Sequence, residues 1–277
     1  MNIRTMVAAV ALALLPIFGS AAAPSQTVQV VYAGSLVATM EGPLKTALNR
    51  DAGLHLSGEA KGSRALANLI VAGLRTPDVF ISADPALLVK LNASHLVKGY
   101  VVFGSARMVV AYSEKSPHRA LFERAAAGKL SILDVLGNPA VRVGRTDPQL
   151  DPKGARTIQV LRLLGAHFHD AAKARAIEAK AGTFPEEDLA VRVESGELDA
   201  GFFYSTETPG RDLRTIELPA DSNLSHSIAY ALAVMNAAPN PRGARIFANF
   251  VLHGAGQGIL QKAGVRYFSH SRINGSF

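Results

Sequence analysis

TVQVVYAGSL, residues 27–36, joins a strand-forming segment to a glycine–serine turn, and this junction decides the fold class. Thr27–Ala33 is rich in β-branched residues, which favour strands. The same order of apolar run, polar turn and helical pattern recurs along the chain, in Asp78–Ala83 (DVFISA), Val141–Gly144 (VRVG) and Asp199–Tyr204 (DAGFFY). Short buried strands that alternate with helices predict an α/β protein with mostly parallel sheets.

Several of these junctions carry signals for the start of a helix. Asp84 and Asp151 each precede a proline, which suits an N-cap followed by proline at the first helical position. Ser63 precedes an apolar stripe at helical spacing and is the expected N-cap there. Gly42-Pro43 interrupts the segment after Ser35, so we expect a short turn and then a helix that starts near Pro43.

Composition narrows the possible chemistry. The chain has 277 residues, 48% of them apolar and 18% charged, which is a globular balance. It contains no cysteine, so thiol nucleophiles, cysteine-based zinc sites, iron–sulfur clusters and disulfides are excluded. Its formal net charge of +7 favours an anionic partner.

The N-terminal segment is typical of a secretory signal. Met6–Phe18 is an unbroken apolar run between Arg4 and the small residues Gly19–Ala23. The run is too short to cross a bilayer, which requires about 20 residues. We therefore predict that residues 1–22 are a signal peptide and that the protein is periplasmic; a retained N-terminal anchor is the alternative. Export argues against nucleic-acid binding, and no Lys/Arg cluster with interleaved aromatic residues supports it.

Two apolar segments are well placed to pass between lobes. They are Met108–Tyr112 (MVVAY) and Ile228–Met235 (IAYALAVM). We predict a discontinuous first lobe, residues 27–108 with 230–277, and an inserted second lobe, residues 109–229.

Enzyme motifs are missing from the sequence. It contains no G-x-S-x-G, S-x-x-K, H-E-x-x-H, G-x-G-x-x-G or P-loop pattern. The alternative is a site built from hydroxyls and from the N–H groups at helix N-termini, which bind anions. Ser35, Ser63 and Asp151 lie at such helix starts, close to the carboxyl ends of strands, where open α/β sheets place their ligands. Simple helix capping is the competing interpretation.

An ordered set of motifs makes the chain resemble the extracellular molybdate/tungstate-binding proteins of ABC importers, and most closely their tungstate-type subgroup. The motifs are Ala33-Gly34-Ser35-Leu36, Gly62-Ser63, Asp78-Val79-x-x-Ser82-Ala83-Asp84, Asp151-Pro152-x-Gly154-x-Arg156, Ser195-Gly196-Glu197-Leu198-Asp199, Glu217-Leu218-Pro219 and Gly256-Gln257-x-Ile259-Leu260-x-x-x-Gly264. Their order and spacing extend over nearly the whole chain after the leader. The resemblance implies a periplasmic binding protein of type II, with two α/β lobes joined by a hinge and the ligand cleft between them.

The resemblance also implies a ligand set. Gly34 and Ser35 would contact the oxyanion through N–H and hydroxyl groups. Gly62-Ser63 would supply a second hydroxyl from the opposite side of the cleft.

Asp151, with the neighbouring backbone at Lys153 and Gly154, resembles the family's aspartate at the metal centre. A carboxylate beside a dianion is repulsive, so it is out of place in a sulfate or phosphate site. Molybdenum and tungsten accept further oxygen ligands, whereas the sulfur of sulfate does not. The aspartate therefore favours a metal oxyanion. The competing interpretation is that Asp151 is only an N-cap that points away from the cleft.

The chain departs from the subgroup at Phe203. The subgroup has a glutamate there as its second carboxylate ligand, and phenylalanine cannot coordinate. Tyr204 or Ser205 would be a replacement hydroxyl, and Glu207 would be a replacement carboxylate if its loop folds back.

These features predict a binding protein and no enzyme, with no cofactor beyond its ligand, molybdate or tungstate. The expected partners are the small oxyanion and the membrane permease of an ABC importer, and a monomer is expected. One alternative keeps the fold but binds sulfate, phosphate or an organic acid, because Phe203 replaces the second carboxylate. A remote alternative is an exported serine hydrolase that uses Ser35 or Ser63.

Overall fold

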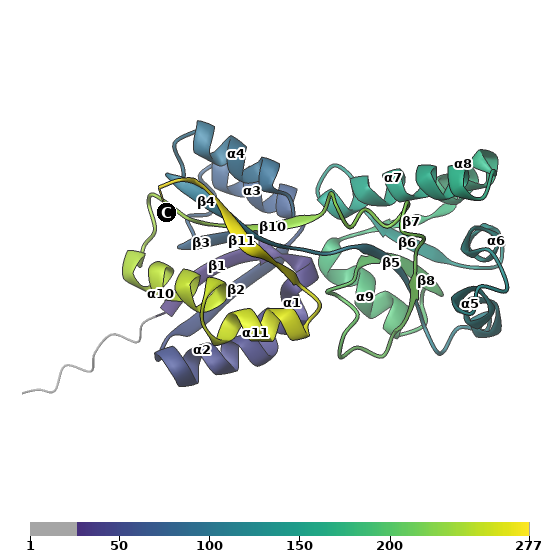
Figure 1. The fold of residues 1–277 in the computed structure, drawn as a ribbon, viewed down its shortest axis with the longest axis horizontal. Coiled ribbons are helices and arrows are strands. Elements are labelled where there is room, and N and C mark those ends of the chain that lie inside the picture. Colours follow the sequence, from purple (N-terminus) through teal and green to yellow (C-terminus); the bar gives the residue numbers. More distant parts are fainter. Residues whose placement is uncertain (1–26, 277) are drawn as a thin grey trace, which may run out of the picture.

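The computed structural model describes residues 27–276 and shows two lobes side by side, each a sheet flanked by helices (Figure 1). The predicted signal peptide, residues 1–22, lies outside the described residues. Within the described part of the chain, no helix is long and apolar enough to cross a membrane.

The first lobe contains a six-stranded sheet with the strand order β11-β4-β10-β3-β1-β2. Its strands are β1 (Thr27–Ala33), β2 (His55–Lys61), β3 (Val79–Ser82), β4 (Gly99–Ser105), β10 (Ala229–Val234) and β11 (Arg266–Gly275). β1 pairs in parallel with β2 and β3, so the carboxyl ends of these three strands lie at the same edge of the sheet. Gly34 and Ser35 follow at that edge, which faces the second lobe.

Helices cover both faces of this sheet. They are the helical turns η1 (Gly34–Leu36), α1 (Val37–Thr39) and η2 (Met40–Leu44), and the helices α2 (Lys45–Ala52), α3 (Ser63–Val71), α4 (Pro85–Ala93), α10 (Pro241–Leu252) and α11 (Ala255–Lys262). α3 and α4 lie on one face, while α2, α10 and α11 lie on the other (Figure 1). Neighbouring strand residues alternate accordingly: Val31 packs with the first group and Val30 with the second.

The second lobe contains a five-stranded sheet with the order β7-β6-β8-β5-β9. Its strands are β5 (Met108–Tyr112), β6 (Val143–Thr146), β7 (Gly182–Phe184), β8 (Ala200–Tyr204) and β9 (Arg214–Glu217). Its helices are α5 (Arg119–Ala126), α6 (Ile132–Gly137), α7 (Pro152–His167), α8 (Ala171–Lys180) and α9 (Glu186–Glu194). Phe203 packs with the buried residues of α9, and Tyr204 with the core on the opposite face.

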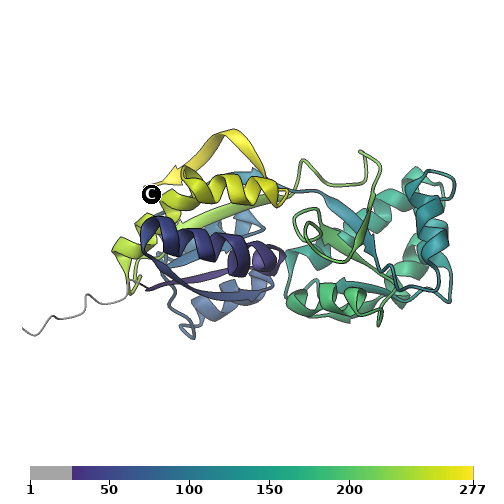
Figure 2. The same cartoon turned by 90° about the horizontal axis from the view of Figure 1, so that it is seen from below.

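The chain crosses between the lobes in two places, from β4 to β5 and from β9 to β10 (Figure 2). Arg107, in the first crossing, pairs with Glu217 at the end of β9 at 2.6 Å. These crossings explain why the prediction of mostly parallel sheets was wrong. β10 runs antiparallel to β3 and β4, and β5 runs antiparallel to β8 and β9, because each returns from the other lobe.

The N-caps of three helices can be compared with those predicted from the sequence. Asp84 and Asp151 are N-caps, as predicted, and accept hydrogen bonds from the N–H groups of residues 86 and 153. The prediction for Ser63 was wrong: Gly62 is the N-cap and Ser63 is the first helical residue. The helix expected near Pro43 is the second half of a helical run that begins at Val37 and is kinked at Gly42.

Candidate functional site

The two lobes touch where the carboxyl ends of their strands face each other. The N–H of Ala65 at the start of α3 donates to the carbonyl of Leu150 at 2.9 Å, and the Arg64 guanidinium donates to the carbonyl of Pro148 at 2.6 Å. Gly62 is required at this contact, because a Cβ there would lie 2.6 Å from the Leu150 carbonyl oxygen and 3.0 Å from the Cβ of Asp151. The structure therefore brings the predicted residues Gly62 and Asp151 together from opposite lobes.

On the first-lobe side, Gly34 and Ser35 form a buried turn at the end of β1. The Ser35 hydroxyl is 3.0 Å from the hydroxyl of Tyr230, which lies 2.8 Å from the hydroxyl of Thr206 in the second lobe. Burial raises the pKa of Tyr230 above its ordinary value, so this hydroxyl stays neutral. A neutral hydroxyl chain thus runs from the turn to the second lobe.

Ser63 is fully buried at the start of α3. Its hydroxyl oxygen accepts a hydrogen bond at 3.1 Å from the N–H of Ala83, at the end of β3. The hydroxyl hydrogen remains free to donate. Ser63 thus joins two strand ends of the first lobe and keeps one donor. The expectation that Ser63 faces Ser35 from the opposite side of the cleft was wrong, because both follow parallel neighbouring strands of one sheet.

Asp151 is buried and uses its two carboxylate oxygens differently. Oδ1 accepts from the Lys153 N–H at 3.2 Å and caps α7, whereas Oδ2 has no hydrogen-bond partner among the described residues. Burial raises the pKa of Asp151 to about 6, because the charged form loses its hydration. The capping interpretation is therefore confirmed for one oxygen, while the other oxygen is a buried acceptor without a hydrogen-bond partner among the described residues.

The second-lobe side of the cleft carries a cluster of buried charged groups, Asp151, Lys153, Glu186 and Glu207, which we call the charged wall. The Lys153 ammonium group lies at its centre. It is fully buried and contacts Glu207 at 2.5 Å and Glu186 at 3.2 Å. Burial alone would lower the pKa of Lys153, but the Glu207 and Glu186 carboxyl groups reverse this and hold it above its ordinary value. The ring of Phe203 lies 5.3 Å from the ammonium nitrogen, within cation–π range.

The two glutamates on Lys153 are held to different degrees. Glu207 is bound on both oxygens, by Lys153 through Oε1 and by the Tyr204 N–H through Oε2 at 2.7 Å. Glu186 is bound by Lys153 through Oε1 alone, and its Oε2 has no hydrogen-bond partner in the described range. Burial raises the pKa of Glu186 well above its ordinary value, against the opposing effect of Lys153.

Two further predicted residues line this wall. Tyr204 is buried and its hydroxyl is unpartnered within the described residues. Gly154 sits in the first turn of α7, where a Cβ would lie 2.5 Å from the carbonyl oxygen of Thr146. Glycine therefore lets α7 approach β6 closely enough to bring Asp151 and Lys153 to the cleft.

Unpartnered polar atoms in a buried site are costly, about 1–3 kcal/mol each for neutral groups and more for charged ones. Here Asp151 Oδ2, Glu186 Oε2 and the Tyr204 hydroxyl are all of this kind. Such groups are rare in folded proteins and call for an explanation. A ligand that they contact would supply one.

Two cavities lie in the cleft, and Glu186 and Glu187 line both. The smaller is about 10 Å³, the size that one water molecule requires, and lies against Gly34, Ser35 and Glu207. The larger is about 350 Å³ and lies against Gly62, Asp151 and Lys61.

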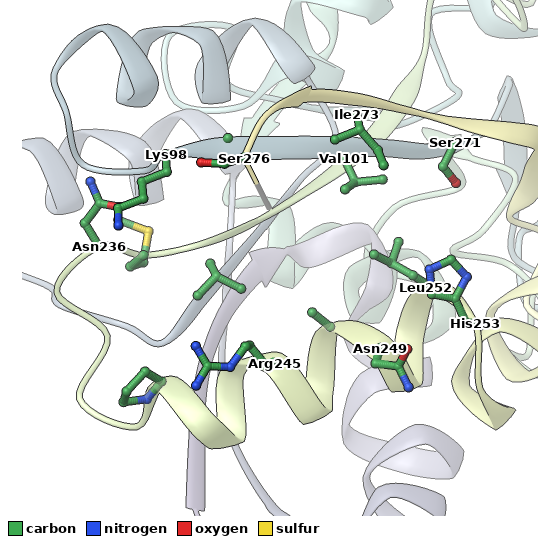
Figure 3. Close-up of a pocket in the computed structure, with 15 residues that line it drawn as sticks. Lys98, Val101, Asn236, Arg245, Asn249, Leu252, His253, Ser271, Ile273 and Ser276 are labelled. Atoms are coloured by element: carbon green, nitrogen blue, oxygen red, sulfur yellow. The ribbon is translucent and has the colours of Figure 1, made fainter.

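A further cavity of about 460 Å³ lies within the first lobe, between β4, β10 and α10 (Figure 3). Lys98 and Arg245 are among its lining residues, and Figure 3 shows Arg245 on α10 below the strands. All of its walls belong to one lobe, so it lacks the two-sided construction of the cleft.

Sequence reasoning missed Glu186, Tyr230 and Thr206. Glu186 opens an acidic helix start, Glu186-Glu187-Asp188, which is the ordinary pattern for offsetting the helix dipole and gives no sign of burial. Tyr230 lies inside an apolar strand pattern. Glu207 was named only as a residue that could reach back, and its loop does bring its carboxylate to Lys153.

The comparisons with known proteins were made on sequence and on structure. Residues 28–266 match the family described as bacterial extracellular solute-binding protein. A putative ABC transporter molybdenum-binding protein of Haloferax volcanii is 35% identical over 208 residues, covering 74% of this chain and 65% of its own length. The molybdate/tungstate-binding protein WtpA of Pyrococcus abyssi is 23% identical over 285 residues, covering 84% of this chain and 82% of its own length.

Among solved structures, the periplasmic molybdate-binding protein of Azotobacter vinelandii superposes with a TM-score of 0.69 at 18% identity. The match covers 86% of this chain and 98% of that one. At this identity the likeness shows a shared fold, the two-lobed architecture of periplasmic binding proteins.

Proposed function

Because the chain belongs to the bacterial extracellular solute-binding protein family, we propose that it captures molybdate or tungstate and delivers it to the permease of an ABC importer. The names of the Haloferax and Pyrococcus relatives support this ligand class. The protein would act in the periplasm as a monomer, after removal of residues 1–22, and as a carrier rather than an enzyme. We propose lobe boundaries at residues 27–108 with 230–277, and at residues 109–229.

The observation that carries the proposal is the free oxygen of Asp151. Oδ2 is buried and has no hydrogen-bond partner among the described residues, and the Cβ of Asp151 lies beside Gly62 of the opposite lobe. Such an oxygen repels sulfate, but it is a ready additional ligand for a metal centre that expands its coordination. A metal oxyanion therefore fits the acidic site better than a simple oxyanion does.

The remaining ligand contacts would come from both sides of the cleft. We propose that the backbone of Gly34 and the hydroxyls of Ser35 and Ser63 donate from the first lobe. From the second lobe we propose Asp151, the Lys153 ammonium, the first turn of α7 at Gly154, and the Tyr204 hydroxyl. Closure of the lobes would then bury the ligand, whose differential affinity stabilises the closed form.

Isothermal titration of the protein with tungstate, molybdate and sulfate tests the proposal. We expect submicromolar binding of tungstate or molybdate and no heat from sulfate. Tight sulfate binding, or no heat from any of the three, would reject it and favour another anion on the same fold.

Replacement of Asp151 by Asn tests the role of its carboxylate. The variant keeps the side-chain shape and the cap oxygen but loses both the charge and the extra ligand. We expect a smaller preference for molybdate over sulfate, measured as the ratio of the two dissociation constants. An unchanged ratio would contradict the coordination by Asp151.

The hydrolase alternative has no support from the serine environments. The Ser35 hydroxyl contacts the Tyr230 hydroxyl, and the Ser63 hydroxyl accepts from the Ala83 N–H. No histidine in residues 27–276 bonds to either serine hydroxyl. A general base within hydrogen-bond reach is what an activated serine needs. Turnover of a generic ester that disappears in Ser35→Ala would revive this alternative.

A further inference from the structure

The Glu186 carboxyl group lies across the cleft, against the turn that precedes α1. Glu186 is the first residue of α9 in the second lobe, and Gly34 begins the turn in the first lobe. A Cβ built on Gly34 would lie only 1.3 Å from Glu186 Oε2. The carboxyl group therefore fills the space that any side chain at position 34 would occupy, directly in front of the proposed donors Gly34 and Ser35.

This position leaves no space for an anion beside the turn. The cavity between Gly34, Ser35 and Glu186 is about 10 Å³, enough for one water molecule. A tetrahedral oxyanion with four oxygen atoms does not fit there while Glu186 stays in place. On its other side, Glu186 borders the cavity of about 350 Å³ at Gly62 and Asp151. The side chain thus stands as a partition between two parts of the cleft.

Glu186 is held weakly enough to move. Its attachment to the wall is the contact of Oε1 with Lys153 at 3.2 Å, and Oε2 is unpartnered. Glu207, by contrast, is fixed on both oxygens. The larger cavity offers a place for the withdrawn side chain, and Lys61 on its wall already pairs with Glu187 at 3.6 Å.

We propose that Glu186 is a displaceable partition that competes with the oxyanion for the Gly34–Ser35 turn and for Lys153, and that it thereby sets the affinity of the site. Binding exchanges one partner of Lys153 for another: the carboxyl group withdraws into the larger cavity, and the oxyanion takes its place. This inference rests on the proposed function, because it concerns the same ligand and the same cleft.

The groups that face Glu186 make the exchange favourable. Lys153 of α7 is the cation that it leaves, while Asp151 at the start of α7 and Glu207 after β8 repel it. Arg211 lines the smaller cavity but pairs with Glu194 at 3.0 Å. The turn on the opposite lobe, Gly34–Leu36, carries no charge.

Titration of Glu186→Ala with tungstate and molybdate tests the competition. We expect about tenfold tighter binding than in the unmodified protein, because the space and Lys153 become available without displacement. Glu186→Gln fills the same space and should bind within about threefold of the unmodified protein. Asp188→Ala is the matched control, since it removes an exposed carboxyl group two residues further along α9 that lines neither cavity of the cleft, and it should change affinity by less than about twofold.

A free carboxylate gives a second readout. Formate is small enough to occupy the space vacated in Glu186→Ala, so millimolar formate should weaken tungstate binding to this variant. The same formate should leave the unmodified protein unaffected, because its own side chain already occupies the place. Thermal unfolding of each variant confirms that the fold is retained.

Weaker oxyanion binding by Glu186→Ala, or binding equal to that of the unmodified protein, would overturn the inference while leaving the proposed function in place. Absence of formate competition in this variant would overturn it as well. Absence of binding in both proteins would reject the proposed function and the inference together.

Discussion

The two walls of the cleft are built from different chemistry. The first lobe presents an uncharged inner wall, made of the Gly34–Ser35 turn, the start of α3 at Ser63, and the Tyr230 hydroxyl. The second lobe presents every buried charge of the inner cleft among the described residues, namely Asp151, Lys153, Glu186 and Glu207. Under the proposed function, we expect this difference to separate two tasks: neutral donors would hold oxygen atoms of any kind, whereas charged groups would determine which ligand is accepted and at what pH.

Removal of the central cation should damage the charged wall most. Lys153→Met leaves two buried carboxyl groups, those of Glu186 and Glu207, without their ammonium partner, and breaking a buried ion pair in this way costs about 3–5 kcal/mol. We expect that loss in the free energy of unfolding, measured by urea denaturation at constant m-value.

Lys61→Met is the matched control for this change. Its pair with Glu187 at 3.6 Å is partly exposed, and exposed pairs contribute only about 0.2–1 kcal/mol. A loss in Lys153→Met no larger than in Lys61→Met would show that the charged wall is not held together by its cation.

Asp151 should make stability depend on pH. Its pKa is about 6 in the folded protein and about 3.9 when unfolded, so the folded state binds more protons between these values. Stability therefore falls as pH rises from about 4 to about 6, by at most about 1.4 kcal/mol per pH unit. Asp151→Asn removes this contribution, and its unfolding free energy should rise relative to the unmodified protein over that range.

Urea denaturation of both proteins at pH 4, 5, 6 and 7 measures this difference. Carboxyl groups outside the cleft titrate equally in the two proteins, so the difference between them reports Asp151 together with Glu186, whose pKa the Asp151 charge raises. If the unfolding free energies of the two proteins change with pH in parallel, Asp151 does not contribute to the pH dependence. That result would contradict the assignment of pH sensitivity to the charged wall through Asp151.

A substitution on the uncharged wall of the first lobe should have a smaller effect, and that effect should not depend on pH. Ser35→Ala removes one hydroxyl, and a lost hydrogen bond to a charged ligand costs about 1–3 kcal/mol of binding free energy. We expect a similar loss for tungstate and molybdate, with no change in the pH profile, by isothermal titration. Ser131→Ala, which removes the hydroxyl that caps α6, should leave binding unchanged. A shift in ligand preference in Ser35→Ala would contradict the separation of tasks.

Local signals in the sequence located six of the eleven strands in the described part of the chain, but not β2, β4, β7, β9 or β11. The strand Thr27–Ala33 and the strand Met108–Tyr112 have the bounds that the sequence predicts, because each is an apolar run closed by polar or glycine residues. The proline-preceding aspartates are caps for the same local reason. The antiparallel direction of β5 and β10 escaped prediction although both strands were predicted, because strand direction depends on the path of the chain between lobes rather than on any local pattern.

In the candidate site, too, local patterns identified some residues and not others. Gly34, Ser35, Gly62 and Asp151 were identifiable from turn and helix-start patterns and from the resemblance to a known family. Glu186 was not, because its burial arises from closure of the second lobe onto Gly34, a contact between residues 152 positions apart in the chain. Lys153 was named for its backbone, yet its side chain is the group that reaches the carboxylates.

The charged groups of the inner cleft all lie between Asp151 and Glu207, in one uninterrupted stretch of the inserted lobe. The first lobe, which is assembled from both ends of the chain, places Lys61 on the wall of the larger cavity, but no buried charged group of its described residues lines either cavity. Ligand preference can therefore diverge within a single stretch of the gene while the rest of the scaffold is inherited unchanged. A graft of this stretch between relatives should transfer selectivity as a module.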